Sequence, residues 1–541
     1  CDIEYWDGTS WKLAGRFSFT PATEVSLTFP TVTTDKMRMI NMTVTGRQSS
    51  NPNFREIECY YNSYGPNDVG VASIDSPYAF CAGTKDIWVT ISNYGINQVD
   101  TVTVNWELDG VSQTPIVYRD TLDTAGGKLS SQAQIKLGSA AFGSTARDIV
   151  VWTSKPNNVA DTVGANDTVS TNIKASLSGK FTIGGTGGDY NDVVSAAEDL
   201  TNFGVCGPVE FDIRPGTYTG HVELGEIIGA SAINTISFVS PHRDSVTVQH
   251  TGTGLNATMN TIELKGTDWV SFENMTIEAD GTYGFAVHLM NNADHNIFNN
   301  CKIQANPSVT STYSIPIVFS GSETYYYTSG SNGNFNEFTN NDVVGGYFAM
   351  TCYGAGVTSP TKGNTFINND FSQMYYYGPY MFYQDSCVFQ DNVIDGYRST
   401  AANYGAYFYY FSNFDIQRNY IKHVYYSYLY YSNYYNWNTT DNSIFANNTV
   451  ISTGTSYAIY GYRMSRINFW HNSIYGKGSY LIYMPYGTGN DMRNNIFWYD
   501  GNLYALYLFN NGWDAWDYND YVISGGNAAY INGSVYSSAS A

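Results

Sequence analysis

Acidic, basic and histidine side chains recur beside one turn motif in the second half of the chain. Asp342 and Asp370 share one position of that motif, and Asp391, Arg418 and His471 share another. Cleavage of a glycosidic bond needs two carboxyl groups at a defined separation. Opposite charges that face each other on neighbouring strands are more commonly a stabilising pair. We therefore expect a structural ladder of charges here and predict no catalytic residue.

The seven histidines show no metal-binding or nucleophile-activating arrangement. No HExxH motif, GxSxG motif or Cys-His grouping occurs among them. We expect packing or surface roles for His221, His242, His250, His288, His295, His423 and His471.

The seven cysteines are scattered and have no CxxC spacing, so we predict no metal site among them. Most are expected to be buried thiols. One disulfide is expected near the N-terminus, drawn from Cys1, Cys59 and Cys81.

One acidic loop is a candidate cation site. Asp161, Asn166 and Asp167 offer oxygen ligands of the kind that Ca²⁺ accepts, but they lack the ligand periodicity of a calcium loop. An ordinary acidic loop is the simpler interpretation. The run GGTGG at 184–188 has neither the phosphate-loop ending nor the dinucleotide-binding order, so no cofactor is predicted.

The composition favours an extracellular all-β protein. Only 13% of the 541 residues are charged, whereas Tyr (48) and Gly (51) are abundant. The net charge of −21 argues against nucleic acid and anionic lipid as partners, because phosphate binding needs clustered Lys and Arg. No apolar run of 18 residues occurs, so membrane insertion is not expected.

A six-residue motif with Asn in its fourth place recurs every 23 to 29 residues, as in FTNNDV, FINNDF, FQDNVI and FWHNSI. This period predicts a solenoid. The two apolar ends are five residues apart, so a tight turn at the asparagine is needed for both to point inward. Earlier segments place Met275 and Cys301 in the same slot. The predicted ladder comprises Asn341, Asn369, Asn392, Asn419, Asn448, Asn472, Asn495 and Asn519.

Pairs of tyrosines three residues apart recur in six consecutive repeats. Residues three apart on a strand face opposite ways, so we expect one column inside or at a corner and one column outside. The outer column is a candidate surface for stacking against sugars or for contact with another protein. The pairs are Tyr377/Tyr380, Tyr404/Tyr407, Tyr428/Tyr431, Tyr457/Tyr460, Tyr480/Tyr483 and Tyr504/Tyr507.

A single amphipathic helix is predicted at 191–204. Asn191 can cap its start, Gly204 can end it, and the apolar stripe is Val193, Val194, Ala197 and Leu200. The helix and the motif repeat resemble the capped entry and the asparagine ladder of pectate-lyase-like right-handed parallel β-helices. The resemblance implies that residues 176–541 form such a β-helix, with the helical segment 191–204 covering its first coil.

Two further modules are expected before it. YWDGTSW, TDKMRM and FREIECY make residues 1–65 resemble the C-terminal half of a discoidin-like β-sandwich. FCAGTKDIWVTISNYG, VNWELDG and DTVGANDTVS make residues 66–175 resemble an immunoglobulin-like module of the CARDB type. The predicted fold class is all-β.

This module order resembles giant cell-surface adhesins and prey-grappling appendages of gliding and predatory bacteria that use type IX secretion. The resemblance implies a non-enzymatic, adhesive segment at the cell surface that assembles with copies of itself and contacts surface glycans or proteins. A polysaccharide-binding or polysaccharide-cleaving β-helix is the alternative. It also implies O-glycosylation at Asp-Ser/Thr-apolar sites, here Thr101, Thr121, Thr162, Thr168 and Ser245. We expect the chain to be a segment of a longer protein.

Overall fold

The computed structural model describes residues 2–6, 9–16, 37–40, 65–124, 127–399, 403–430 and 443–537. The chain divides into two units, Cys1–Tyr64 and Gly65–Ala541. Within the described residues, no helix is long and apolar enough to cross a membrane.

The first unit contains a small antiparallel sheet with the strand order β2-β1-β3. Its strands are β1 (Asp2–Trp6), β2 (Trp11–Arg16) and β3 (Met37–Ile40). The strand expected in TDKMRM is thus present as β3, whereas those expected over 18–30 and 53–62 lie outside the described residues. The discoidin-like assignment stays a prediction.

The second unit begins with two antiparallel sheets that enclose one apolar core. Alternation in β6 buries Val102, Val104 and Trp106 and leaves the residues between them half-exposed, as a strand covered on one face requires. One sheet holds β4 (Val69–Ser76), β5 (Gly83–Asn93) and β9 (Gln132–Phe142); the other holds β6 (Val102–Leu108), β7 (Val111–Ser112), β8 (Ile116–Tyr118), β10 (Arg147–Ser154) and β11 (Thr168–Ile173). A short 3₁₀-helix, η1 (Pro156–Asn158), follows β10.

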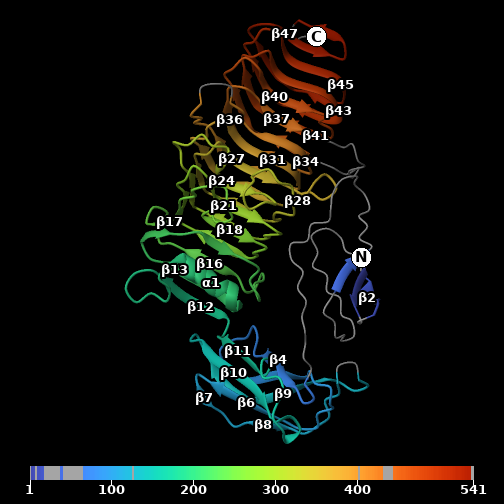
Figure 1. The fold of residues 1–541 in the computed structure, drawn as a ribbon. Coiled ribbons are helices and arrows are strands. Elements are labelled where there is room, and N and C mark those ends of the chain that lie inside the picture. Colours follow the sequence, from blue (N-terminus) through green and yellow to red (C-terminus); the bar gives the residue numbers. More distant parts are fainter. Residues whose placement is uncertain are drawn as a thin grey trace. The chain divides into compact units, whose positions relative to one another are not determined.

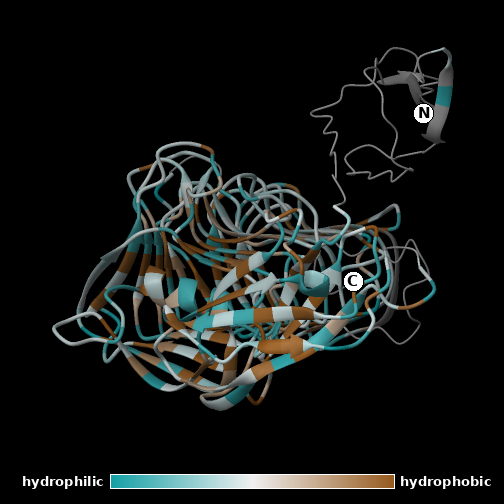
Figure 2. Cartoon of the chain, turned by 60° about the horizontal axis from the view of Figure 1, so that its bottom comes forward, coloured by the Kyte–Doolittle hydropathy of each residue, from teal (hydrophilic) through white to brown (hydrophobic). Residues whose placement is uncertain are grey.

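The chain then enters a parallel β-helix, the solenoid that occupies the upper part of Figure 1. Strands stack in a 25-stranded and a 12-stranded sheet, and one coil contributes strands to both, as in β31 (Tyr377–Asp385), β32 (Val388–Gln390) and β33 (Val393–Ile394). Hydrophobic and hydrophilic residues alternate in bands along many of these strands (Figure 2). The predicted solenoid is therefore confirmed.

One helix, α1 (Val193–Phe203), packs against β12 (Leu177–Ile183) and β15 (Val222–Leu224) at the start of the stack. Gly204 ends it as predicted, but the cap is Asp192, whose side chain accepts from the Ser195 N–H at 2.8 Å. Asn191 lies one residue before the cap position and is exposed, so it does not cap the helix.

The buried stripe of α1 also differs by one residue from the prediction. Val193, Ala197 and Leu200 are buried as expected, together with Ala196, whereas Val194 is only partly buried. The small Ala196 lets the helix axis approach the coil closely, so Val194 lies at the margin of the contact.

A disulfide joins the sandwich to the first coil. Cys81 pairs with Cys206, which follows it by 125 residues and lies in β13 (Val205–Ile213). The expectation of a bond among Cys1, Cys59 and Cys81 is wrong for Cys81, because the fold brings a distant strand beside it. Cys1 and Cys59 lie outside the described residues. Cys301, Cys352 and Cys387 are buried free thiols.

The interior of the solenoid is a column of stacked side chains. Phenylalanine rings on successive coils stack at centroid distances of 4.7 to 5.4 Å, namely Phe211, Phe238, Phe272, Phe298, Phe338 and Phe366. Because every coil places an apolar side chain at the same angle, the core continues through the stack.

Each repeat turns at the residue before its asparagine. The residue at this position has a left-handed backbone conformation, with φ between 55 and 58°, as in Asn340, Asn368, Asp391 and Arg418. This reverses the strand alternation, so both apolar ends of the motif point inward, as Phe338 and Val343 show. Asparagine and aspartate adopt this conformation more readily than most residues.

The next residue is the asparagine that links the coils. The Oδ1 of each one accepts from the backbone N–H of the asparagine one coil earlier at 2.8 to 3.0 Å, from Asn341 to Asn519. Its Nδ2 donates to a backbone carbonyl of that same earlier coil, as Asn392 does to Phe366 at 2.9 Å. Cys301 begins the ladder, with its N–H donating to Asn341 and its thiol to the Phe272 carbonyl.

A second asparagine column lies five residues earlier in the coils. Asn296, Asn336 and Asn364 repeat the same N–H to Oδ1 bonds. Asn490 continues the column later, accepting from the Ile467 N–H at 3.1 Å. In the coils between Asn364 and Asn490, Cys387 and other residues take this position. The repeat of asparagine in the sequence therefore did not reveal this column.

We expect Asn392→Ala to destabilise the solenoid by about 3 kcal/mol, because it leaves donors of Asn369 and the Phe366 carbonyl buried without partners. Denaturant titration followed by circular dichroism measures the change. The matched control is Asn502→Ala at an exposed position, which should change the free energy of unfolding by no more than about 0.5 kcal/mol. Equal effects of the two variants would contradict the ladder's role.

Candidate functional site

The tyrosine pairs lie in register on one side of the solenoid. We call this surface the tyrosine face; its rungs come from β31, β34 (Tyr407–Ser412), β37 (Ser427–Tyr430), β40 (Tyr457–Tyr462), β43 (Tyr480–Arg493) and β45 (Tyr504–Asp517). Tyr457 pairs with Tyr480, which pairs with Tyr504, and the second tyrosines of the rungs align in the same way. Tyr530 of β47 (Asn527–Ile531) extends the second column by one coil.

Both columns point outward; of the two places expected for one column, inside or at a corner, the interior is wrong. Tyr457 and Tyr460 are half-buried, and the two residues between them, Ala458 and Ile459, are buried. Two adjacent inward residues break strand alternation, and the ladder pairing indeed omits the residue after the first tyrosine. The backbone therefore bends within each rung and turns both hydroxyphenyl groups to one side.

One rung was assigned to the wrong residues. The register pairs Tyr428 with Tyr407 and Tyr460, so Tyr428 is the second tyrosine of its rung and Tyr425 stands three residues before it. The sequence predicts Tyr428 as the first tyrosine, paired with Tyr431, on the expectation that an insertion around NYYNWNTT displaces the pair by five residues from its usual distance to Asn448. Tyr431 lies outside the described residues.

Rings within each column stack on one another. Centroids are 4.5 Å apart for Tyr377 and Tyr404, 4.6 Å for Tyr380 and Tyr407, and 4.7 Å for Tyr483 and Tyr507, with near-parallel planes. Across a rung the two rings meet edge to face. The ring faces are thus largely used within the face, and some hydroxyl groups bond to neighbouring tyrosines, as that of Tyr404 does to Tyr426. A ligand would therefore meet mainly ring edges and the hydroxyl groups at the surface.

The tyrosine face carries no formal charge in its rungs. The segments 377–383, 404–410, 457–462, 480–486 and 504–509 contain no Asp, Glu, Lys, Arg or His. Burial and the neighbouring Tyr404 raise the pKa of Tyr377 well above its usual range. Burial and Tyr507 raise the pKa of Tyr483 to about 12. The phenols are therefore neutral donors and acceptors at physiological pH, and general acid–base chemistry has no carboxylate here.

Three of the five charged turn residues form ion pairs, whereas Asp370 stands beside a like charge. Arg418 lies 2.7 Å from Asp391 on the coil before, and Asp342 pairs with Arg243 at 2.8 Å. Burial followed by the charge of Asp342 raises the pKa of Asp370, which stands in register with it. His471 is exposed. The Asp391–Arg418 pair, which joins two neighbouring coils, has the geometry of a structural ladder.

The acidic loop of the sandwich gathers like charges. Asn166 donates to Asp68 at 2.8 Å, while Asp161 accepts from the N–H groups of Val69 and Val163. Burial and the charges of Asp161 and Asp68 raise the pKa of Asp167 to about 6. Calcium binding at this loop stays a prediction.

The five predicted glycosylation positions all belong to the described residues. Thr162 and Thr168 are exposed, whereas Thr101, Thr121 and Ser245 are half-buried. The Thr121 hydroxyl donates to Asp100, and that of Ser245 donates to the His242 carbonyl. Modification at these positions stays a prediction.

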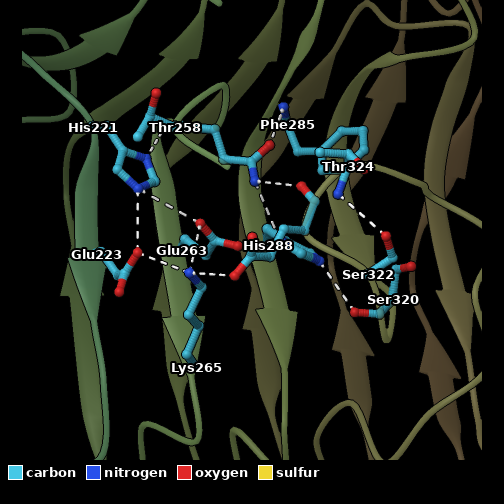
Figure 3. Close-up of polar contacts among 12 residues, drawn as sticks. His221, Glu223, Thr258, Glu263, Lys265, Phe285, His288, Ser320, Ser322 and Thr324 are labelled. Atoms are coloured by element: carbon cyan, nitrogen blue, oxygen red, sulfur yellow. Dashed lines mark hydrogen bonds and ion pairs between the residues drawn. The ribbon is translucent and has the colours of Figure 1, made fainter. Parts of the chain in front are cut away.

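A polar cluster that the sequence analysis missed lies on the early coils (Figure 3). We call it the histidine–glutamate cluster: His221, Glu223, Glu263, Lys265, His288 and Glu323. Glu223, Glu263 and His288 occupy one register position on β15, β18 (Ile262–Lys265) and β21 (Gly284–Met290). The segments VEL, IEL and VHL carry the signal, since each places one polar residue between two inward apolar ones.

No family model and no curated protein matches the chain. Among solved structures, the surface adhesin PfbA of Streptococcus pneumoniae is similar at 11% identity and a TM-score of 0.38, over 65% of this chain and 93% of that one. Pectate lyase Pel9A is similar at 13% identity and 0.29, over 68% and 82%. A CARDB domain of the PF1109 protein of Pyrococcus furiosus, solved with di-metal ions, is similar at 13% and 0.17, over 21% and 99%.

These likenesses concern the fold alone. They include an adhesin and a polysaccharide-cleaving enzyme, so they do not choose between an adhesive and a polysaccharide-acting β-helix.

We expect a group of tyrosines to stay protonated above pH 10. Because the folded-state pKa of Tyr483 exceeds its ordinary value of 10.0, the folded chain holds a proton that the unfolded chain loses. Stability from this group is full below pH 10 and falls as the pH rises toward about 12. Absorbance titration of phenolate and alkaline unfolding test this, and Tyr483→Phe should remove part of the late-titrating signal. Uniform titration of all tyrosines near pH 10 would contradict it.

Proposed function

We propose that the chain is a non-enzymatic, adhesive segment of an extracellular bacterial surface protein or appendage, and that the tyrosine face makes its contacts. The observation that carries the proposal is the alignment of half-exposed, uncharged tyrosines in two continuous columns on a rigid stack. A contiguous exposed aromatic surface usually marks an interface. Tyrosine combines contact area with a polar group at low entropic cost.

The stacked geometry favours a ligand that lies along the solenoid axis. Each coil adds hydroxyl groups at the strand spacing of about 4.8 Å, and each hydroxyl can both donate and accept. An extended glycan chain offers hydroxyl groups of its own at regular intervals. We therefore propose a surface glycan as the ligand, held by hydrogen bonds to ring edges more than by stacking on ring faces.

Polysaccharide cleavage is the alternative, and the histidine–glutamate cluster is one group that could perform it. Glu263 and His288 at its centre are completely buried. A general acid or base must come within hydrogen-bond reach of its substrate. Only the cluster's outer side chains reach solvent, so the geometry favours the non-enzymatic proposal.

Secretion by the type IX pathway, a role in gliding or predation and self-assembly belong to the same proposal. They rest on the order of modules in the sequence, with the discoidin-like and CARDB-type segments before the solenoid. O-glycosylation at exposed Thr162 and Thr168 would fit an extracellular place.

Glycan binding should depend on the tyrosine hydroxyl groups. A variant with Tyr457, Tyr460, Tyr480 and Tyr483 changed to Phe keeps the ring stacking and should lose at least tenfold in affinity on a glycan array. Tyr78→Phe and Tyr518→Phe, at exposed positions of 72% and 76%, are the matched controls. Because the face is uncharged, binding should change little with salt.

Equal array signals for the wild type and the fourfold variant would remove the face as a glycan site. Cleavage of uronic-acid polymers by the purified chain would contradict the non-enzymatic part of the proposal.

The native assembly should contain more than one copy. Native mass spectrometry or mass photometry of the protein purified from its source should give a multiple of the chain mass. A monodisperse monomer at cellular concentration would count against an appendage, although not against glycan binding.

A further inference from the structure

His221 directs one ring nitrogen at two glutamates without hydrogen-bonding to either. Its Nδ1 lies 2.7 Å from the Asn260 carbonyl, which can only accept, so the proton is on Nδ1. In the neutral ring Nε2 then presents a lone pair. That Nε2 lies 3.6 Å from Oε2 of both Glu223 and Glu263, beyond hydrogen-bond distance.

Glu263 is the second side chain with an unsatisfied atom. It is completely buried, yet its Oε2 has no hydrogen-bond partner, as is also true of His221 Nε2. The Lys265 ammonium lies 3.8 Å from that oxygen, beyond hydrogen-bond distance, so the desolvation cost of the carboxylate is only partly offset. Its other oxygen, Oε1, lies 3.0 Å from His288 Nδ1, and His288 Nε2 donates to the Ser320 carbonyl at 3.2 Å.

The outer contacts are those that orient metal ligands. A metal-binding histidine commonly donates its other N–H to a carbonyl, and a metal-binding carboxylate is held by a further hydrogen bond. His221 and Glu263 have these partners in Asn260 and His288, and Figure 3 shows both side chains turned toward Glu223. Three ligand atoms, one nitrogen and two oxygens, lie within 4.8 Å of one another.

The charge balance also favours a cation. Three carboxylates, on Glu223, Glu263 and Glu323, face the ammonium of Lys265, which lies 2.8 Å from Glu223 and from Glu323 and 3.8 Å from Glu263. They also face the ring of His288, whose two nitrogens both point at oxygen atoms. The negative charges of the cluster therefore outnumber the positive ones.

We propose that His221, Glu223 and Glu263 bind a divalent transition-metal ion, with zinc as the best fit. Zinc takes nitrogen and carboxylate ligands at about 2.1 Å in a tetrahedron, which puts neighbouring ligand atoms about 3.4 Å apart. The two 3.6 Å separations around His221 Nε2 come close to this edge. Three protein ligands leave a fourth position for water. The site ties two neighbouring coils together and is independent of the tyrosine face.

The test is metal binding by the full chain after chelator treatment. Zn²⁺ alone, titrated by calorimetry near neutral pH, should bind at one equivalent, and Co²⁺ should give the intense visible bands of tetrahedral coordination. His221→Gln, Glu223→Gln and Glu263→Gln should each weaken zinc binding at least tenfold. His471→Gln and Glu337→Gln, at exposed positions elsewhere on the solenoid, should leave it unchanged.

Absence of saturable zinc binding by the folded wild type would overturn the proposal and leave a proton as the occupant of the cluster. Unchanged affinity in the three cluster variants would also overturn it. Because Glu223 is half-exposed, with 48% of its side chain accessible, Glu223→Gln tests the site even if Glu263→Gln fails to fold.

Discussion

The hydrogen bond from one coil's asparagine N–H to the next coil's asparagine side chain is the interaction on which the rest of the structure depends. The side-chain amides from Asn341 to Asn495 are buried, so their oxygen and nitrogen atoms both need partners, and the neighbouring coils supply them. The left-handed residue just before it sets the corner angle. A coil that slipped by one residue would lose these bonds and would turn its apolar side chains outward.

Fixed register turns a one-dimensional repeat into aligned surface rows. The phenylalanine stack inside, the tyrosine columns outside and the histidine–glutamate cluster all consist of residues far apart in sequence that share one angular position. The tyrosine face and the cluster lie on different coils, so one stack can present a neutral contact surface and hold a charged, buried group without either disturbing the other. A rigid, repetitive scaffold of this kind suits adhesion, where many weak contacts act together.

The sequence predicted what the period controls. The solenoid, the position of the asparagine column, the helix at 191–204 and the buried thiols follow from spacing and polarity alone. Prediction from the sequence failed where a local bend or a long-range contact sets the structure. Both tyrosines of a rung face outward because two inward residues lie between them. Cys81 forms its disulfide with Cys206, which is 125 residues away in the sequence. The cluster around Glu263 was hidden for the same reason, since Glu223 lies 40 residues before Glu263 and His288 lies 25 residues after it, and only stacking unites them.

Native-state hydrogen exchange tests the central claim most directly. If the ladder holds the stack, the backbone amides of Asn369, Asn392, Asn419, Asn448 and Asn472 should be among the slowest in the chain and should exchange at similar rates, because they open only when coils separate. Exchange of these five amides as fast as that of amides in exposed loops would contradict the account, because the register would then have to be fixed by packing alone.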